Sequence, residues 1–333
     1  MNNNNGTDTP ATNPSATVAP PASTAPQSAP ASLAATPPRR LSPMGNLFAR
    51  AGVTLGILTR NPSSAVGLAI LVLFSLVAIF APWIAPYGTF EVIYDANHAV
   101  VRLATPNATN WFGTTNQGMD VFSQMVWSTR VILMVGLVSA VCTSIIGTLI
   151  GLFSGYFAGW IDDALMRMTD VAFGIPFMPF AMVVISMARP SLALVVLLII
   201  VFLWRTVARV IRSQVLTLKT RPFVWSARAA GASDLKILFR HIAPNALPLA
   251  FLYMAIAVQQ AVMLEAALSF LGFGDPHEQS WGTMLNAAFR AGAVRSAWWW
   301  VLPPGLCLSA FVMGVFMITR AYEEILNPRL RSV

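Results

Sequence analysis

Few residues in this chain could do chemistry, and their spacing forms no catalytic set. The two lysines, Lys219 and Lys236, each follow a leucine, so neither belongs to a Gly-Lys-Ser/Thr loop that binds nucleotide phosphates. The three histidines are scattered, without a pair at metal-ligand spacing. The adjacent acids Asp162 and Asp163 are typical of a solvated turn at the start of a helix. The sequence therefore predicts no enzyme, no metal site and no cofactor bound by this chain.

One polar stretch, residues 221–248, has an organised pattern of helix signals. Pro222 suits the start of a short helix of about two turns. Gly231 suits the left-handed position that ends such a helix, and Ser233 or Asp234 can cap a second one. The pattern predicts a short helix held outside the membrane on a tight glycine turn. A plain amphipathic connector at the membrane interface would show the same pattern.

The composition requires a membrane environment for the rest of the chain. The 333 residues are 56% hydrophobic and only 10% charged, whereas soluble domains carry about 25% charged residues. A helix of about 20 mostly apolar residues crosses a bilayer. We expect an all-α membrane protein with six transmembrane helices, at about 65–81, 131–153, 168–188, 191–207, 246–271 and 299–318. Pro176 and Pro179 interrupt the third.

Lysines and arginines predict the orientation of these spans. They concentrate in the N-terminal flank, between the fourth and fifth spans, and at the C-terminus, so they mark one side of the membrane rather than a nucleic-acid site. Both termini and a loop at about 213–245 are therefore expected in the cytosol, with a periplasmic segment at about 83–128. Residues 1–60 form a Pro/Ala/Ser/Thr-rich tail and basic flank that we expect to be disordered. The membrane domain is expected over 61–333.

Small and polar residues inside the spans are further candidates. The second span has glycines four residues apart, which leave one helix face bare for packing within the chain or against a partner chain: Gly147, Gly151, Gly155 and Gly159. In the fifth span, Gln259 or Gln260 is expected to face a pathway. Glu265 is a candidate for a structural or gating hydrogen bond, or for lining that pathway. Arg167 and Asp170, three residues apart, are expected to pair locally.

Ordered blocks over most of 61–331 resemble a known family of membrane proteins. The run G-A-S-D-L-K-I-L-F-R-H-I-A-P-N-A-L-P, from Gly231, resembles the coupling loop of permeases in the dipeptide/oligopeptide/nickel branch of ABC importers. Other blocks of that branch are W-F-G-T from Trp111, G-Y-F-A-G-W-I-D-D from Gly155, E-A-A-L-S-F-L-G-F-G from Glu265 and N-P-R-L-R from Asn327. The resemblance is closest to the second permease of such pairs.

The resemblance implies a type I importer permease fold with a cytosolic coupling helix. Such a subunit forms half of the translocation pathway for peptides or a related small solute in a bacterial inner membrane. Its implied partners are a second permease in a heterodimer, two cytosolic ATPases that bind ATP and Mg, and a periplasmic or lipid-tethered binding protein. The implied ATPase-docking residues are Phe223, Trp225, Ala227, Arg228, Gly231 and Asp234.

Two departures from the family pattern are visible. An acidic residue usually opens the loop motif, where this chain has Trp225, so a salt bridge to the ATPase at that point is not expected. Charged residues usually occupy three periplasmic positions that are Thr115, Met119 and Gln124 here. A stand-alone secondary transporter or channel is the alternative, but it would show inverted repeats or a span rich in ionisable groups.

Overall fold

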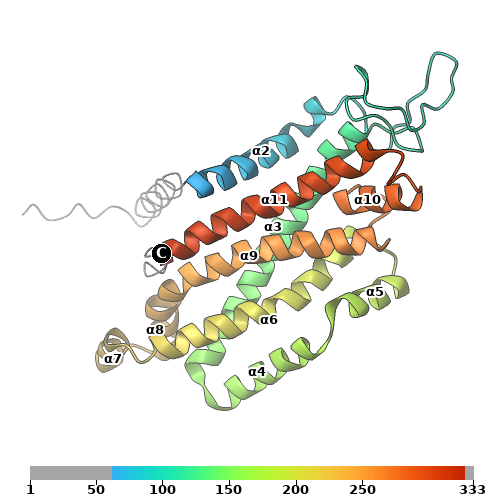
Figure 1. The fold of residues 1–333 in the computed structure, drawn as a ribbon. Coiled ribbons are helices and arrows are strands. Elements are labelled where there is room, and N and C mark those ends of the chain that lie inside the picture. Colours follow the sequence, from blue (N-terminus) through green and yellow to red (C-terminus); the bar gives the residue numbers. More distant parts are fainter. Residues whose placement is uncertain (1–61, 327–333) are drawn as a thin grey trace, which may run out of the picture. The chain divides into compact units, whose positions relative to one another are not determined.

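The structure, a computed structural model, describes residues 62–326, and these residues form helices without any strand. The expected N-terminal tail therefore lies outside the described residues. The elements, labelled in Figure 1, are α2 (Pro62–Ile84), α3 (Val121–Phe157), α4 (Gly159–Gly174), α5 (Phe177–Met187), α6 (Leu192–Leu218), α7 (Pro222–Ala229), α8 (Asp234–Ile237), the π-helical turn η1 (Leu238–Ile242), α9 (Ala243–Phe270), α10 (Trp281–Arg290) and α11 (Trp298–Leu326).

Five of these segments are long and apolar enough to cross a membrane: α2, α3, α6, the continuous stretch Asp234–Phe270, and α11. The sixth expected span is a pair of helices, α4 and α5, which meet at an angle of 82°. Pro176 lacks an N–H and clashes with a preceding helical carbonyl, so α4 ends before it. The sequence located this interruption at Pro176, but Pro179 lies inside the first turn of α5 and does not interrupt it. The segment also begins at Gly159 rather than at residue 168.

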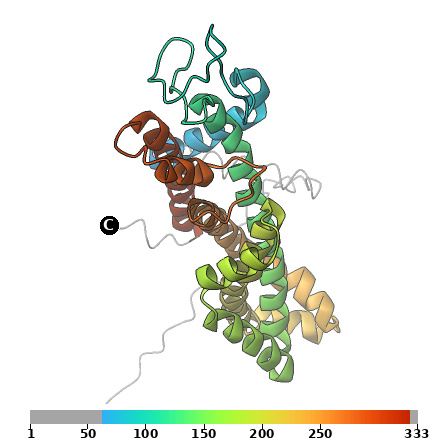
Figure 2. The same cartoon turned by 90° about the vertical axis from the view of Figure 1, so that its right-hand side faces the viewer.

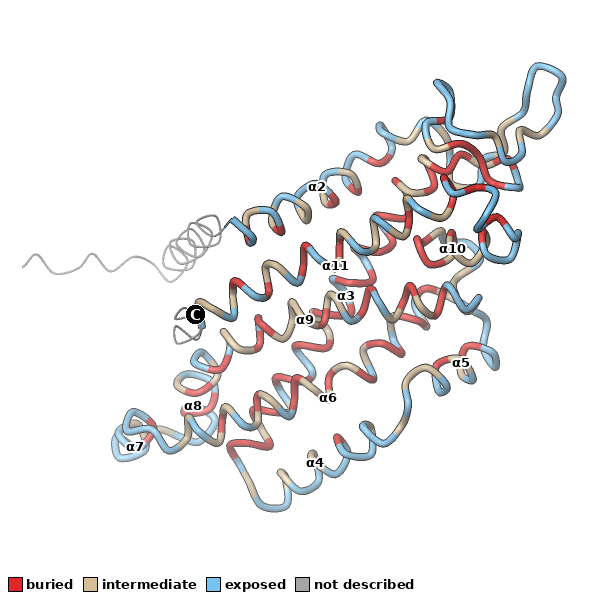
Figure 3. The backbone as a smooth tube through the Cα atoms, viewed as in Figure 1, coloured by how far each residue is buried: buried red, intermediate tan, exposed pale blue. Residues whose placement is uncertain are grey.

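α3 is the central element of the bundle. It packs against α6 along much of its length and also contacts α9, α2 and α4. Its 37 residues measure about 55 Å, more than the about 30 Å of hydrocarbon in a bilayer. Buried residues follow α3, α6 and α9, whereas α2 and α4 are mostly exposed (Figure 3). In two perpendicular views, α10 lies at one end of the bundle and α7 at the other (Figures 1 and 2); we name these the α10 end and the α7 end.

Three glycines allow the close approach of α3 and α6. A Cβ atom on Gly147 would lie 2.6 Å from the Trp204 carbonyl oxygen, and one on Gly151 would lie 2.6 Å from that of Ala208. A Cβ atom on Gly155 would lie 2.8 Å from Cβ of Val215. The fourth glycine of the row, Gly159, has no such neighbour and instead takes a positive φ of 60° as the first residue of α4. The glycine spacing is therefore used within this chain, by three of its four members.

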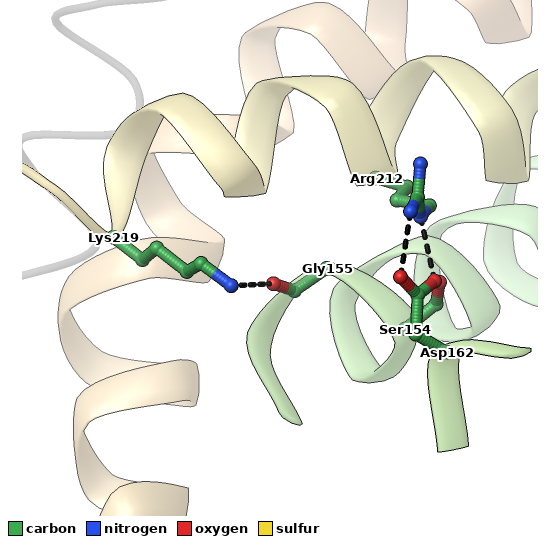
Figure 4. A network of polar contacts seen from close by, with 5 residues as sticks. All are labelled: Ser154, Gly155, Asp162, Arg212 and Lys219. Atoms are coloured by element: carbon green, nitrogen blue, oxygen red, sulfur yellow. Dashed lines mark hydrogen bonds and ion pairs between the residues drawn. The ribbon is translucent and has the colours of Figure 1, made fainter. Parts of the chain in front are cut away.

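An ion pair fixes the turn between α3 and α4 to α6 (Figure 4). Nε and Nη2 of Arg212 each donate to a different oxygen of the Asp162 carboxylate, both at 2.6 Å. The Ser154 hydroxyl also donates to Asp162, and Lys219 Nζ donates to the Gly155 carbonyl at 3.0 Å. The Asp162 side chain is only 13% exposed, so it is not the solvated turn residue that the sequence suggested. We call this set of contacts the Asp162 clamp.

A second correction concerns Asp170, which pairs with Arg209 of α6 at 2.6 Å and not with Arg167. Both side chains of this pair are more than half exposed. Arg167 and Asp170 are three residues apart on α4, as the sequence indicated. The Asp170 carboxylate nevertheless pairs with Arg209, because α6 packs beside α4.

We predict that Gly151→Ala destabilises the folded chain, whereas Gly305→Ala does not. The added methyl would meet backbone on α6, and overpacking costs about 1–3 kcal/mol. Gly305 lies in α11 with no atom within 4 Å of its would-be Cβ, and the same change there favours the helix by about 0.5–1 kcal/mol. Thermal unfolding of the purified chain in detergent measures both. Equal midpoints for the two variants would contradict the packing role.

We also predict that Asp162→Asn and Arg212→Gln act on stability non-additively. Each change leaves a partly buried charged group unpaired, at a cost of about 1–3 kcal/mol, so the double variant loses much less than the sum. The exposed pair Asp170 and Arg209 is the matched control, since exposed pairs contribute about 0–1 kcal/mol. Additive effects at the clamp would show that Asp162 and Arg212 do not stabilise the chain through contact with each other.

Candidate functional site

The loop between α6 and α9 is built on a glycine turn. Pro222 occupies the first turn of α7, and the helix ends where Gly231 takes a φ of 78°. The Gly231 N–H donates to the Arg228 carbonyl at 3.0 Å, and the Ala232 N–H to the Ala227 carbonyl at 3.1 Å. No atom lies within 4 Å of a Cβ at Gly231, so backbone conformation rather than space requires glycine there.

The chain then continues into the membrane without a break. α8 has four residues and passes directly into η1, where the Ala243 N–H donates to the Leu238 carbonyl, an i to i−5 bond. α9 follows and contains Pro244 and Pro248. The sequence placed a capped helix and a re-entry point here but gave no sign of the π turn. As a result, α8, η1 and α9 form one continuous helical path, Asp234–Phe270.

Buried residues on one side of this loop anchor it to α3 and α6. Val224, Ile237 and Leu238 are buried and pack in a cluster with Leu152 and Val215. The sequence analysis did not single out Val224. An apolar residue beside Phe223 on a two-turn helix could have indicated the side of the helix that packs against the bundle.

The other side of the loop is exposed. Of the candidate docking residues, Ala227 is half-buried, and the remaining five are exposed: Phe223, Trp225, Arg228, Gly231 and Asp234. Trp225 is 60% exposed, and the Arg228 guanidinium lies 6.0 Å from the centre of its ring. A bulky aromatic side chain is thus presented outward on a loop whose opposite side is fixed.

A polar contact ties the loop to α3. The Tyr156 hydroxyl donates to Asp234 Oδ1 at 2.6 Å, and Arg228 Nη2 lies 3.4 Å from the same hydroxyl and 3.5 Å from the carboxylate. The contact with Tyr156 raises the pKa of Arg228 further above its ordinary value, so this guanidinium stays charged at any physiological pH. Tyr156 was missed because its partner is 78 residues away in the chain.

The polar candidates on α9 separate into two environments. Gln260 is exposed and lines a groove with Phe177, Arg205 and Thr206, between α5, α6 and α9. Gln259 is half-buried and does not line that groove. Glu265 is buried, and its Oε1 accepts a hydrogen bond from Ser269 at 2.6 Å. Within 62–326, its Oε2 has no hydrogen-bond partner.

Thr115, Met119 and Gln124 are the uncharged residues at positions where the family usually has charged ones, and they lie close together at the α10 end. The Met119 N–H donates to Thr115 Oγ1 at 3.1 Å, and Gln124 Nε2 lies 3.1 Å from the Met119 sulfur. Together with Ser269 and Trp300 they line a pocket of about 250 Å³. The sequence gave no indication that Ser269 and Trp300, more than 140 residues further along the chain, line the same pocket.

Comparison with known proteins identifies the family. Residues 147–332 match the model for the binding-protein-dependent transport system inner membrane component. Residues 54–106 match the N-terminal TM domain of oligopeptide transport permease C. The first match alone covers more than half of the chain.

Several curated relatives align over most of their length. The chain is 33% identical to a dipeptide transport system permease protein of Alkalihalophilus pseudofirmus, over 83% of this chain and 88% of the relative. It is 31% identical to an oligopeptide transport system permease protein of Bacillus subtilis, over 82% and 87% respectively. It is 34% identical to a glutathione transport system permease protein of Escherichia coli O6:K15:H31, over 79% and 85%. The chain therefore belongs to the binding-protein-dependent transport system inner membrane components and is a multi-pass permease subunit of an ABC importer.

Proposed function

We propose that this permease forms half of a translocation pathway for peptides or peptide-like solutes, beside a second and different permease chain. Relatives named for dipeptide, oligopeptide and glutathione transport support this substrate class. Two ATPases that bind ATP and Mg supply the energy, since the two lysines of this chain lack a phosphate-binding loop. A periplasmic or lipid-tethered binding protein delivers the solute.

The α7 end lies in the cytosol of a bacterial cell and the α10 end faces outward across the inner membrane. The concentration of arginine and lysine between α6 and α9 supports this orientation. The binding protein then meets the α10 end, where Glu278 and Arg290 line the same pocket as Met119 and are exposed.

The α7 loop couples the ATPases to the spans. The observation that carries this proposal is the two-sided character of α7, with Val224 buried against α3 and α6 and Trp225 exposed. An ATPase that binds Trp225 and Phe223 can displace α7. Because Val224 packs against α3 and α6, this displacement would move those helices as well. Because Asp234–Phe270 is one helical path, the same displacement reaches Gln260. Rocking between two packed states then opens the path to alternate sides.

We predict that Trp225→Ala weakens ATPase binding to the assembled permease. Removing a central exposed aromatic from an interface commonly costs about 2 kcal/mol or more, or about 30-fold in affinity. Trp111→Ala is the matched control, because Trp111 is 64% exposed in the segment before α3. Co-purification of the ATPases measures binding, and ATP-dependent uptake of trialanine and glutathione into proteoliposomes measures transport. Uptake without any ATPase would instead support a secondary transporter.

A second prediction concerns Gly231, where two substitutions separate backbone strain from size. Gly231→Val should abolish uptake while leaving membrane insertion intact, since a left-handed conformation costs a β-branched residue at least about 1–2 kcal/mol. Gly231→Asn should keep most of the uptake, because asparagine tolerates that conformation. Immunoblots of membrane fractions check insertion. Normal uptake by the valine variant would count against a rigid coupling turn.

A further inference from the structure

A groove on the side of the bundle differs from the sites described above. It lies between α2 and α3, with α9 and α11 contributing, and encloses about 520 Å³. Its apolar lining consists of Leu71, Ala78, Ile79, Leu133, Leu137, Val258, Phe311 and Val315. The hydroxyl of Ser75, which also lines it, donates to the Leu71 carbonyl at 2.7 Å. That hydroxyl is therefore satisfied within its own helix.

The one charged side chain that lines this groove is Arg130 of α3. Arg130 is exposed, and its guanidinium lies 5.3 Å from the centre of the Trp127 ring. No ion pair joins it to an acid anywhere in 62–326, although Glu278 lines an adjoining depression with it. A cation beside an apolar groove thus lacks a carboxylate partner in this chain.

Aromatic residues indicate the depth of Arg130 in the membrane. Trp83, near the end of α2, is 79% exposed, and Trp127 Nε1 donates to the Tyr87 carbonyl. Tryptophan and tyrosine collect at the boundary between hydrocarbon and water. Arg130 lies three residues along α3 from Trp127, about 4.5 Å deeper, where a long side chain still reaches the headgroups.

From that level the groove runs toward the middle of the bilayer. On α2 it extends from Ile79 to Leu71, eight residues or about 12 Å. One leaflet contributes about 15 Å of hydrocarbon. The groove therefore has the length and the apolar lining for an acyl chain, below a cation placed for a phosphate.

We propose that this groove is a binding site for an anionic phospholipid. One acyl chain lies along α2 and α3, and the phosphodiester pairs with Arg130 through charge-assisted hydrogen bonds. A net negative headgroup is preferred to a zwitterionic one, because no acid lines the groove to receive a choline or ethanolamine cation and Arg130 forms no ion pair within 62–326.

Native mass spectrometry of the full chain tests this site. The probe is a mixture of phosphatidylglycerol and phosphatidylcholine in equal amounts, in vesicles from which the protein is extracted. We expect the wild type to retain phosphatidylglycerol about fivefold over phosphatidylcholine, the preference that one basic residue near the membrane surface gives. Arg130→Gln should lose this preference, whereas Arg102→Gln, an exposed arginine outside the groove, should keep it. Equal retention of both lipids by the wild type would overturn the proposal.

A second pair of variants tests the acyl-chain part of the site. Ile79→Trp fills the groove and should reduce retention of both lipids. Leu73→Trp changes a residue of α2 that is similarly exposed, 59% against 61%, but does not line the groove, and it should have no effect. In the assembled transporter, a cysteine at Ile79 that cross-links to the second permease would identify a protein helix as the occupant and would also overturn the lipid site.

Discussion

The close contact between α3 and α6 is the constraint on which the rest of the bundle depends. It brings two backbones within reach of each other because Gly147, Gly151 and Gly155 have no side chains to separate them. Between helices in lipid, close van der Waals packing replaces the hydrophobic driving force that acts in water. The Asp162 clamp fixes the end of this contact at Arg212, about two turns before α6 ends at Leu218. The α7 loop therefore begins from a fixed position.

That fixed origin gives the loop its mechanical character. A surface loop without buried residues would absorb a push from a partner by bending. Here Val224, Ile237 and Leu238 fill a cluster with residues of α3 and α6, and Tyr156 binds Asp234. Interiors packed this closely transmit strain. The π turn adds to this effect, because it joins α8 to α9 without a flexible linker.

The two ends of the bundle use different chemistry. At the α7 end, Arg212 and Lys219 are held in the Asp162 clamp, and Arg228 pairs with Asp234. At the α10 end, Thr115 and Gln124 are buried uncharged residues, and Arg130 forms no ion pair within 62–326. A paired charge contributes to the fold, whereas an unpaired one is available to a ligand. This difference is the reason that the lipid site is inferred at Arg130 and not at Arg212.

The sequence by itself determined the elements that lie in the membrane and the turn that ends α7. Apolar length requires spans, Pro176 requires an interruption, and Gly231 permits a left-handed residue, and each of these is a local property of the chain. The glycine spacing on α3 also predicted a helix-packing face. It did not predict which helix packs there, because the same spacing occurs at contacts within one chain and between chains.

Only the tertiary structure decided which groups meet. Asp170 had two candidate cations, and the packing of α4 beside α6 selected Arg209 over Arg167. Asp162 became a partly buried partner of Arg212 because α6 passes over the turn, 50 residues away in the chain. The roles of Tyr156 and Val224 and the pocket around Gln124 also depend on contacts with distant parts of the chain, so only the structure shows them. Local patterns fix backbone conformation within a few residues, whereas the partner of a polar or charged group depends on helix packing over long sequence separations.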